Sequence, residues 1–126
     1  MIIDTDVLIW FYRGYEIAKK IVLDAVPFKV SAITYIELLE GIRNKEELGK
    51  LKEDFSEWGV EILQINENIS LKAIALVEKY KLSHNLELSD SLIAATALEN
   101  NEILLTGNFK HYGYIKNLNV NRFLTF

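Results

Sequence analysis

Short apolar segments alternate with longer segments of helical periodicity along the chain, and this alternation restricts the possible folds more than any other feature. Apolar runs typical of buried strands fall at residues 1–4, 28–33, 60–65, 102–106 and 119–126. Strands separated by helices pair in parallel through right-handed crossovers. The pattern therefore predicts an α/β fold, a three-layer α/β/α sandwich around a central, mostly parallel sheet of four to five strands.

The segments between these strands are predicted to be helical because apolar residues recur in them at intervals of three and four. These helices are expected at residues 7–14, 15–26, 33–43, 45–59, 66–82 and 89–100. Thr5 or Asp6 is expected to cap the first helix and Ser89 the last. Ile17, Ile21, Val22 and Ala25 should form the buried face of the second. Residues 107–117 are expected to be a loop.

The composition bounds the class of protein. The chain has 126 residues, of which 50% are hydrophobic and 25% charged, so residues 1–126 are expected to form one domain. Because there is no cysteine, disulfides, thiolate zinc sites and cysteine nucleophiles are excluded. The net charge of −4 argues against a protein that coats nucleic acid through positive charge, but not against a nuclease that carries its own cations.

The amino-terminal segment indicates in which cellular compartment the protein is expected. The longest wholly apolar run covers residues 7–12, far short of the roughly 20 residues that span a bilayer. Asp4 and Asp6 interrupt the first ten residues, which is unlike a secretory signal. We therefore expect a cytoplasmic protein.

Polar residues fall where the predicted parallel strands end, which is the edge at which open α/β sheets bind ligands. They are Asp4, Asp6, Glu37, Asp90, Thr106, Asn108 and His111. Taken singly, each acid has a structural explanation as a helix cap, a partner of a helix dipole or a solvated side chain. Carboxylates gathered at one place repel each other unless a cation neutralises them, and oxygen ligands suit Mg²⁺ or Mn²⁺.

Four blocks of the sequence carry a family resemblance. DTDVLIW, SAITYIELLEGI, LSDSLIAATAL and ILLTGNFKHY resemble, in order and type, the blocks of PIN-domain ribonucleases, most closely the VapC-like toxins of type II toxin–antitoxin pairs. The resemblance covers the whole chain. It implies a PIN-like fold, endoribonuclease activity on RNA with Mg²⁺ or Mn²⁺ as cofactor, a cognate antitoxin protein as partner, and a homodimer.

The same resemblance implies roles for particular residues. Asp4, Glu37 and Asp90 match the catalytic, metal-binding acids, with Asp4 as the central ligand and Glu37 as a direct or water-mediated one. It also implies supporting positions at Asp6, Thr106, Asn108 and His111. At position 111 many members of the family have an acid, so the chain departs from the pattern there.

Several basic and aromatic residues near the carboxyl terminus are candidates for contact with RNA. Lys110, Lys116 and Arg122 are candidates for contact with phosphates, and Tyr112 or Tyr114 for stacking on a base. Exposed lysines and half-buried tyrosines more often have purely structural roles.

The sequence leaves two alternative functions open. Asp4 and Asp6 also resemble the paired aspartates of haloacid-dehalogenase-like phosphatases, in which Asp4 would be the nucleophile and Asp6 the acid/base. Against this, Leu8 stands where that family has threonine or valine, and no later paired-aspartate motif with a suitable lysine follows. The other alternative is a catalytically weakened PIN-like domain that only binds a partner, for which His111 is the main argument.

Overall fold

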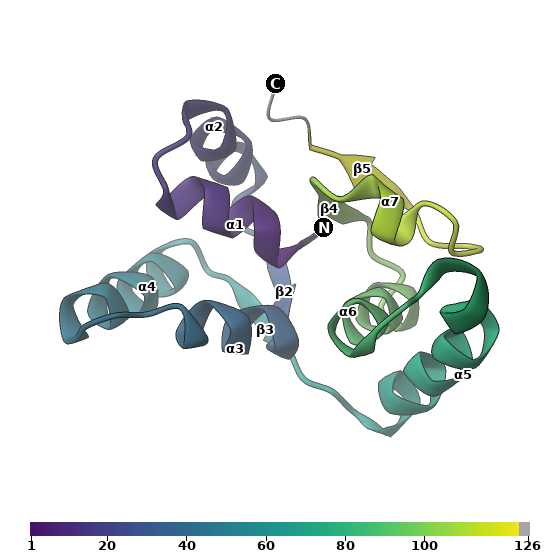
Figure 1. The fold of residues 1–126 in the computed structure, drawn as a ribbon. Coiled ribbons are helices and arrows are strands. Elements are labelled where there is room, and N and C mark those ends of the chain that lie inside the picture. The colour runs from purple at the N-terminus through teal and green to yellow at the C-terminus, as the bar shows by residue number, and fades with distance from the viewer. Residues whose placement is uncertain (124–126) are drawn as a thin grey trace.

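The computed structural model describes residues 1–123 and has a five-stranded parallel sheet at its centre (Figure 1). The strands lie in the order β3-β2-β1-β4-β5, and every neighbouring pair is parallel. They are β1 (Ile2–Ile3), β2 (Lys29–Ser31), β3 (Glu61–Leu63), β4 (Leu104–Thr106) and β5 (Val120–Arg122). The predicted α/β/α fold class is confirmed. Residues 124–126, part of the last predicted strand, lie outside the described residues.

Helices cover both faces of this sheet (Figure 1). They are α1 (Thr5–Tyr12), α2 (Glu16–Ala25), α3 (Ala32–Glu40), α4 (Lys45–Glu57), α5 (Glu67–His84), α6 (Leu88–Glu99) and α7 (Phe109–Tyr112). Helices α1, α2 and α4 pack on one face, and α5 and α6 on the other. Helix α3 contacts both α1 and α6, which places it between the two layers. Within residues 1–123, no helix is both long and apolar enough to cross a membrane.

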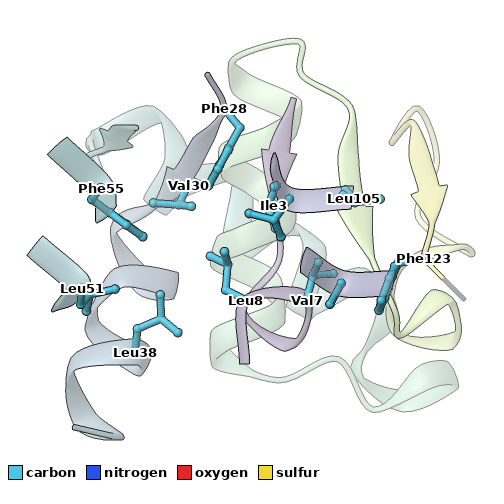
Figure 2. Close-up of a cluster of buried hydrophobic side chains, with 12 residues drawn as sticks. Ile3, Val7, Leu8, Phe28, Val30, Leu38, Leu51, Phe55, Leu105 and Phe123 are labelled. Carbon is cyan, nitrogen blue, oxygen red and sulfur yellow. The ribbon is translucent and has the colours of Figure 1, made fainter. Parts of the chain in front are cut away.

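The core is divided between the two faces of the sheet because successive strand residues point in opposite directions. On one face, Ile3 and Val30 pack with Leu8 of α1 and with Phe55 of α4 (Figure 2). On the other face, Ile2 and Leu104 pack against Ile93, Ala94 and Ala97 of α6. Full burial of such a side chain stabilises the fold by about 1.5–3 kcal/mol for the larger ones, and the alanines let α6 approach the sheet closely.

Two of the predicted helix caps are wrong. Asp4, not Thr5 or Asp6, caps α1, because β1 ends at Ile3 and the Asp4 side chain accepts a hydrogen bond from the Thr5 N–H. Ser89 lies inside α6, whose N-cap position is taken by Glu87 without a side-chain hydrogen bond. The Ser89 hydroxyl donates to a carboxylate on another helix instead.

Two further expectations need correction. In α2 the buried residues are Ala18 and Val22, whereas Ile17 is 51% exposed, so the buried face is rotated from the predicted one. The predicted loop of residues 107–117 contains the one-turn helix α7, which burial of Tyr112 holds against the sheet.

A cluster of charges ties the strands together at the edge opposite their carboxyl ends. Glu102, just before β4, accepts hydrogen bonds from the Met1 ammonium group at 2.6 Å and from the Lys29 ammonium group of β2. The hydrogen bond from Lys29, followed by that from Met1, lowers the pKa of Glu102 below its usual value. The carboxylate therefore links the ends of three neighbouring strands.

We predict that Glu102→Gln lowers the melting temperature by roughly 2–5 °C at pH 7, because the negative charge between the two ammonium groups is lost and one of the two acceptor oxygens becomes an amide NH2 group. The folded-state pKa is below the unfolded one, so this stabilisation is present above pH 4.5 and is lost as the pH falls below it. Thermal unfolding followed by circular dichroism at pH 7 and pH 3.5 measures both effects. Glu46→Gln, at an exposed position of α4, is the control. Equal melting of the two variants at pH 7 would contradict the prediction.

Candidate active site

Asp4 lies at the carboxyl end of the central strand and is only 5% exposed. Its Oδ1 accepts a hydrogen bond from the Thr5 N–H at 2.8 Å, and its Oδ2 accepts one from the Thr106 hydroxyl at 2.7 Å. The Asn108 N–H donates to the Thr106 oxygen at 3.0 Å, which leaves the Thr106 proton directed at Asp4. Strand β4 and the first turn of α1 thus fix the Asp4 carboxyl group from two sides.

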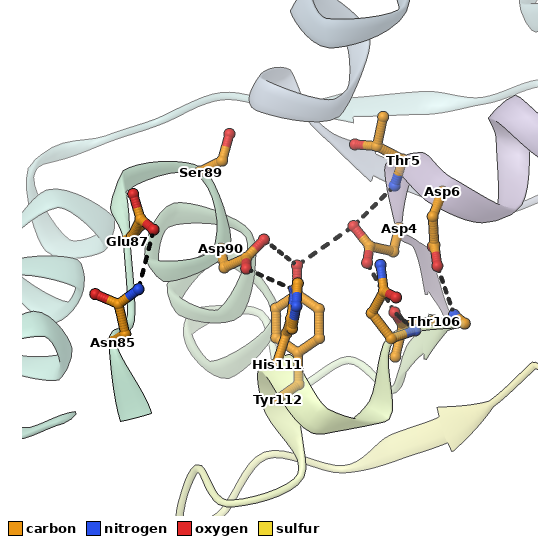
Figure 3. Close-up of polar contacts among 12 residues, drawn as sticks. Asp4, Thr5, Asp6, Asn85, Glu87, Ser89, Asp90, Thr106, His111 and Tyr112 are labelled. Carbon is orange, nitrogen blue, oxygen red and sulfur yellow. Dashed lines mark hydrogen bonds and ion pairs between the residues drawn. The ribbon is translucent and has the colours of Figure 1, made fainter. Parts of the chain in front are cut away.

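Asp90 faces Asp4 from the first turn of α6 (Figure 3). Its Oδ1 accepts a hydrogen bond from the Tyr112 hydroxyl at 3.0 Å, and its Oδ2 lies 3.0 Å from Nδ1 of His111. The same Tyr112 hydroxyl is 3.4 Å from Oδ1 of Asp4. One buried hydroxyl therefore lies between the two carboxyl groups.

Glu37 of α3 is linked to both aspartates through neighbouring hydroxyl groups. Its Oε1 accepts a hydrogen bond from Thr5 at 2.7 Å, and its Oε2 accepts one from Ser89 at 3.1 Å. Thr5 follows Asp4 in the chain, and Ser89 precedes Asp90. The structure thus brings Asp4, Glu37 and Asp90 to the same edge of the sheet, with hydroxyl groups between them.

Asp6 lies in the first turn of α1 and contacts the start of the loop after β4. Its Oδ2 accepts a hydrogen bond from the Gly107 N–H at 3.0 Å, whereas its buried Oδ1 has no hydrogen-bond partner among residues 1–123. A Cβ at position 107 would come within 2.6 Å of Oδ2 of Asp6, so this approach requires glycine. The contact holds the loop that carries Asn108 against α1.

The acids at this edge are held in an unfavourable electrostatic environment. Burial, together with the nearby charge of Asp6, raises the pKa of Asp4 to about 7. Burial also raises the pKa of Asp6 above its usual value. Among the contacts between acidic and basic groups of residues 1–123, only the one between His111 and Asp90 involves these acids, and it is an ion pair only when the imidazole is protonated.

These residues fit a divalent cation by their chemistry. The unpartnered Oδ1 of Asp6 and the pKa of Asp4, raised first by burial and then by the charge of Asp6, indicate buried carboxyl groups that lack compensation, which a hard cation with oxygen ligands would provide. As the side chains lie, no three Asp, Glu, His or Cys residues within the described part of the chain are grouped closely enough to hold one ion. A cation held here would contact two carboxylates directly and the third through water.

The sequence indicated the acids but missed the hydroxyl groups between them. Tyr112, considered above for base stacking, is fully buried, so its ring cannot stack on a base. Tyr114, in contrast, is only half-buried, and its ring forms a stacked pair with His84, with the ring centres 3.8 Å apart. The available signal was the placement of Thr5 and Ser89 directly beside Asp4 and Asp90, in the segments DTD and LSD.

The fold and these acids place the chain in a known class of protein. The profile of the PIN domain family matches residues 1–114, and the chain belongs to this family. The resemblance to VapC-like toxins seen in the sequence is confirmed, and nothing supports the phosphatase alternative. No curated protein sequence matches the chain.

Solved structures of toxin–antitoxin systems are similar to this chain over nearly its full length. A toxin–antitoxin complex from Klebsiella pneumoniae contains a chain with 27% identity and a TM-score of 0.78, with 93% of each chain covered. VapBC-1 from nontypeable Haemophilus influenzae contains one with 28% identity and a TM-score of 0.78, with 96% of each chain covered. VapBC2 from Rickettsia felis, bound to a DNA fragment from its promoter, shares the fold at 18% identity, a TM-score of 0.78 and 97% coverage of each chain.

We predict that Asp6→Asn raises the melting temperature by roughly 2–5 °C in the presence of a chelator. The amide oxygen can still accept the Gly107 hydrogen bond, while a buried negative charge beside Asp4 is removed. Thermal unfolding in EDTA measures the effect. Asp24→Asn, at an exposed position of α2, is the matched control and should leave the melting temperature unchanged. A lower melting temperature for Asp6→Asn would show that the charge itself stabilises the fold.

Proposed function

We propose that this chain is an endoribonuclease that depends on Mg²⁺ or Mn²⁺ and acts as the toxin of a toxin–antitoxin pair. The observation that carries the proposal is the meeting of Asp4, Glu37 and Asp90 at the carboxyl edge of a PIN-domain sheet. When bound, the cation supplies an activated water and neutralises charge at the phosphorus atom. We take residues 1–126 as one PIN-like domain acting in the cytoplasm.

Each acid has a proposed role that follows from its position. Asp4 and Asp90, which share the Tyr112 hydroxyl, would bind the cation directly. Glu37, half-buried and held by Thr5 and Ser89, would act through water and orient the attacking molecule. Because the cation would supply the activated water, no side chain would need to form a covalent intermediate.

Four other residues are proposed to support this arrangement. Thr106 fixes the Asp4 carboxyl group, and the Asn108 backbone orients the Thr106 hydroxyl. Asp6 holds the loop after β4 through Gly107, and His111 contacts the outer oxygen of Asp90.

RNA as the substrate is supported by side chains near Asp90. The ring of Tyr114 is stacked on the exposed ring of His84, and burial, followed by the charge of Asp90, raises the pKa of Tyr114. Aromatic surfaces of this kind stack on unpaired bases. Lys110 is exposed on α7, beside His111. Lys116, in contrast, lines a separate cavity of about 340 Å³ with Glu102, at the opposite edge of the sheet, and is therefore remote from the proposed path of the cleaved RNA.

An antitoxin segment as partner is supported by a groove that reaches the acids. The groove has a volume of about 760 Å³ and lies between α1, α3 and α4. Ile9, Leu38 and Ile42 give it an apolar lining, and charged side chains such as Arg43 stand at its rim. Glu37 also lines it, so a segment bound there would reach the catalytic edge.

A second copy of the chain is also among the proposed partners. Leu71 and Ile74 on α5 and Leu88 at the start of α6 are each more than half exposed. Exposed apolar side chains of this kind are found at protein–protein interfaces, where a partner covers them. They support the homodimer that the family resemblance implies.

We predict that the purified chain cleaves RNA with Mg²⁺ or Mn²⁺ and not with EDTA. Asp4→Asn and Asp90→Asn should each reduce the cleavage rate at least 100-fold while the circular dichroism spectrum is retained, because each removes a proposed ligand of the cation. Products should carry 5′-phosphate and 3′-hydroxyl ends, since water is the nucleophile. Asp24→Asn, remote on α2, is the control. Products with 2′,3′-cyclic phosphates would contradict the mechanism.

The groove makes a separate prediction about the partner. We predict that a small antitoxin protein is encoded next to this chain's gene, that it co-purifies with the chain and that it suppresses RNA cleavage. Ile9→Arg, which places a charge in the apolar lining, should abolish the complex and leave cleavage intact. Ile17→Arg, at a similarly exposed position of α2 outside the groove, is the matched control. Retention of the complex by Ile9→Arg would place the partner on another surface.

A further inference from the structure

The hydroxyl group of Tyr112 touches both aspartates that are proposed to bind the cation. We propose that this hydroxyl competes with the divalent cation for the oxygens of Asp4 and Asp90, and that Tyr112 is a positioning residue that sets how tightly the cation is held. The inference rests on the proposed cation-dependent function and adds to it a residue outside the acidic set.

The position of the hydroxyl is fixed by the burial of the ring. Tyr112 has no exposed surface and belongs to the apolar cluster that includes Ile93, Leu104 and Ile115. The adjoining Gly113 lies so close to Phe109 that a Cβ there would come within 2.4 Å of the Phe109 ring, so the turn around Tyr112 is tightly packed. The ring cannot swing away from the acids without moving α7. The hydroxyl therefore remains within reach of the two carboxyl groups.

The Tyr112 hydroxyl satisfies the hydrogen-bonding needs of the two carboxyl groups only in part. A phenol has one proton to donate, and the shorter distance, 3.0 Å, is to Oδ1 of Asp90. The hydroxyl oxygen lies 3.4 Å from Oδ1 of Asp4, so any hydrogen bond to that oxygen is weak. A divalent cation interacts favourably with both carboxylates at once. Hydroxyl and cation are thus alternative partners of the same two oxygens, and the cation is the stronger one.

His111 differs from Tyr112 although the two are neighbours on α7. It contacts the other oxygen of Asp90, Oδ2, and its side chain is 54% exposed. An exposed side chain can turn into solvent when a cation arrives, whereas the buried ring of Tyr112 cannot. The competition therefore comes from Tyr112.

The test compares Tyr112→Phe with Tyr80→Phe. Both substitutions remove one hydroxyl from the same apolar cluster, but the Tyr80 hydroxyl accepts a hydrogen bond from the Lys116 N–H and contacts none of the acids. Calorimetric titration with Mn²⁺ gives the affinity, and thermal unfolding in EDTA and in saturating Mn²⁺ gives the stability of the two states.

For Tyr112→Phe we expect Mn²⁺ to bind roughly 3- to 10-fold more tightly, as expected from the loss of one competing hydrogen bond to a charged group. Its melting temperature should fall in EDTA and match that of the parent in saturating Mn²⁺. Tyr80→Phe should bind Mn²⁺ like the parent. A purely structural role for Tyr112 predicts weaker binding instead.

Equal or weaker Mn²⁺ binding by Tyr112→Phe than by the parent overturns the inference, and if the parent binds Mn²⁺ the proposed function stands. If Tyr112→Phe binds Mn²⁺ and the parent does not, the result supports the inference most strongly. If neither protein binds Mn²⁺, the inference and the proposed cation-dependent function both fall.

Discussion

The burial of a carboxyl group between two parallel strands is the constraint on which the rest of this site depends. Asp4 follows β1, the middle strand of the sheet, and is almost wholly removed from solvent. A buried carboxylate is strongly destabilising unless hydrogen bonds and opposite charges compensate it. The N–H of Thr5 and the hydroxyl of Thr106 provide the hydrogen bonds, the Tyr112 hydroxyl lies 3.4 Å away, and these contacts determine how α1, β4 and α7 meet.

The two edges of the sheet use charge in opposite ways. At the amino-terminal edge, Glu102 is matched by two cations, and its pKa is lowered. At the carboxyl edge, Asp4 and Asp6 lack such cations and their pKa values are raised. Perturbed acids of the second kind gather at functional sites, because the stability that they remove from the fold is returned when a ligand binds. One edge therefore serves stability, and the other is proposed to serve binding.

The sequence predicted the parts of this molecule that depend on local pattern. Periodicity located all five strands, and the strand ends located Asp4 and Thr106, because parallel topology brings these ends to one edge. The sequence did not predict contacts that depend on tertiary packing. Ser89 has the sequence features of a helix cap, but its hydroxyl donates to Glu37 on another helix. From the sequence, Tyr112 resembles a surface aromatic residue, but in the structure the packing of α7 buries it.

Glu37 belongs at once to the groove between α1, α3 and α4 and to the acids at the end of the sheet. For a toxin of the proposed kind, this overlap limits how the protein can change over time. A substitution at this position that loosened the grip of an inhibitor would also disturb the group that orients water. The same substitution would then weaken inhibitor binding and reduce enzyme activity. This coupling would keep toxin and inhibitor paired without any further selection for pairing.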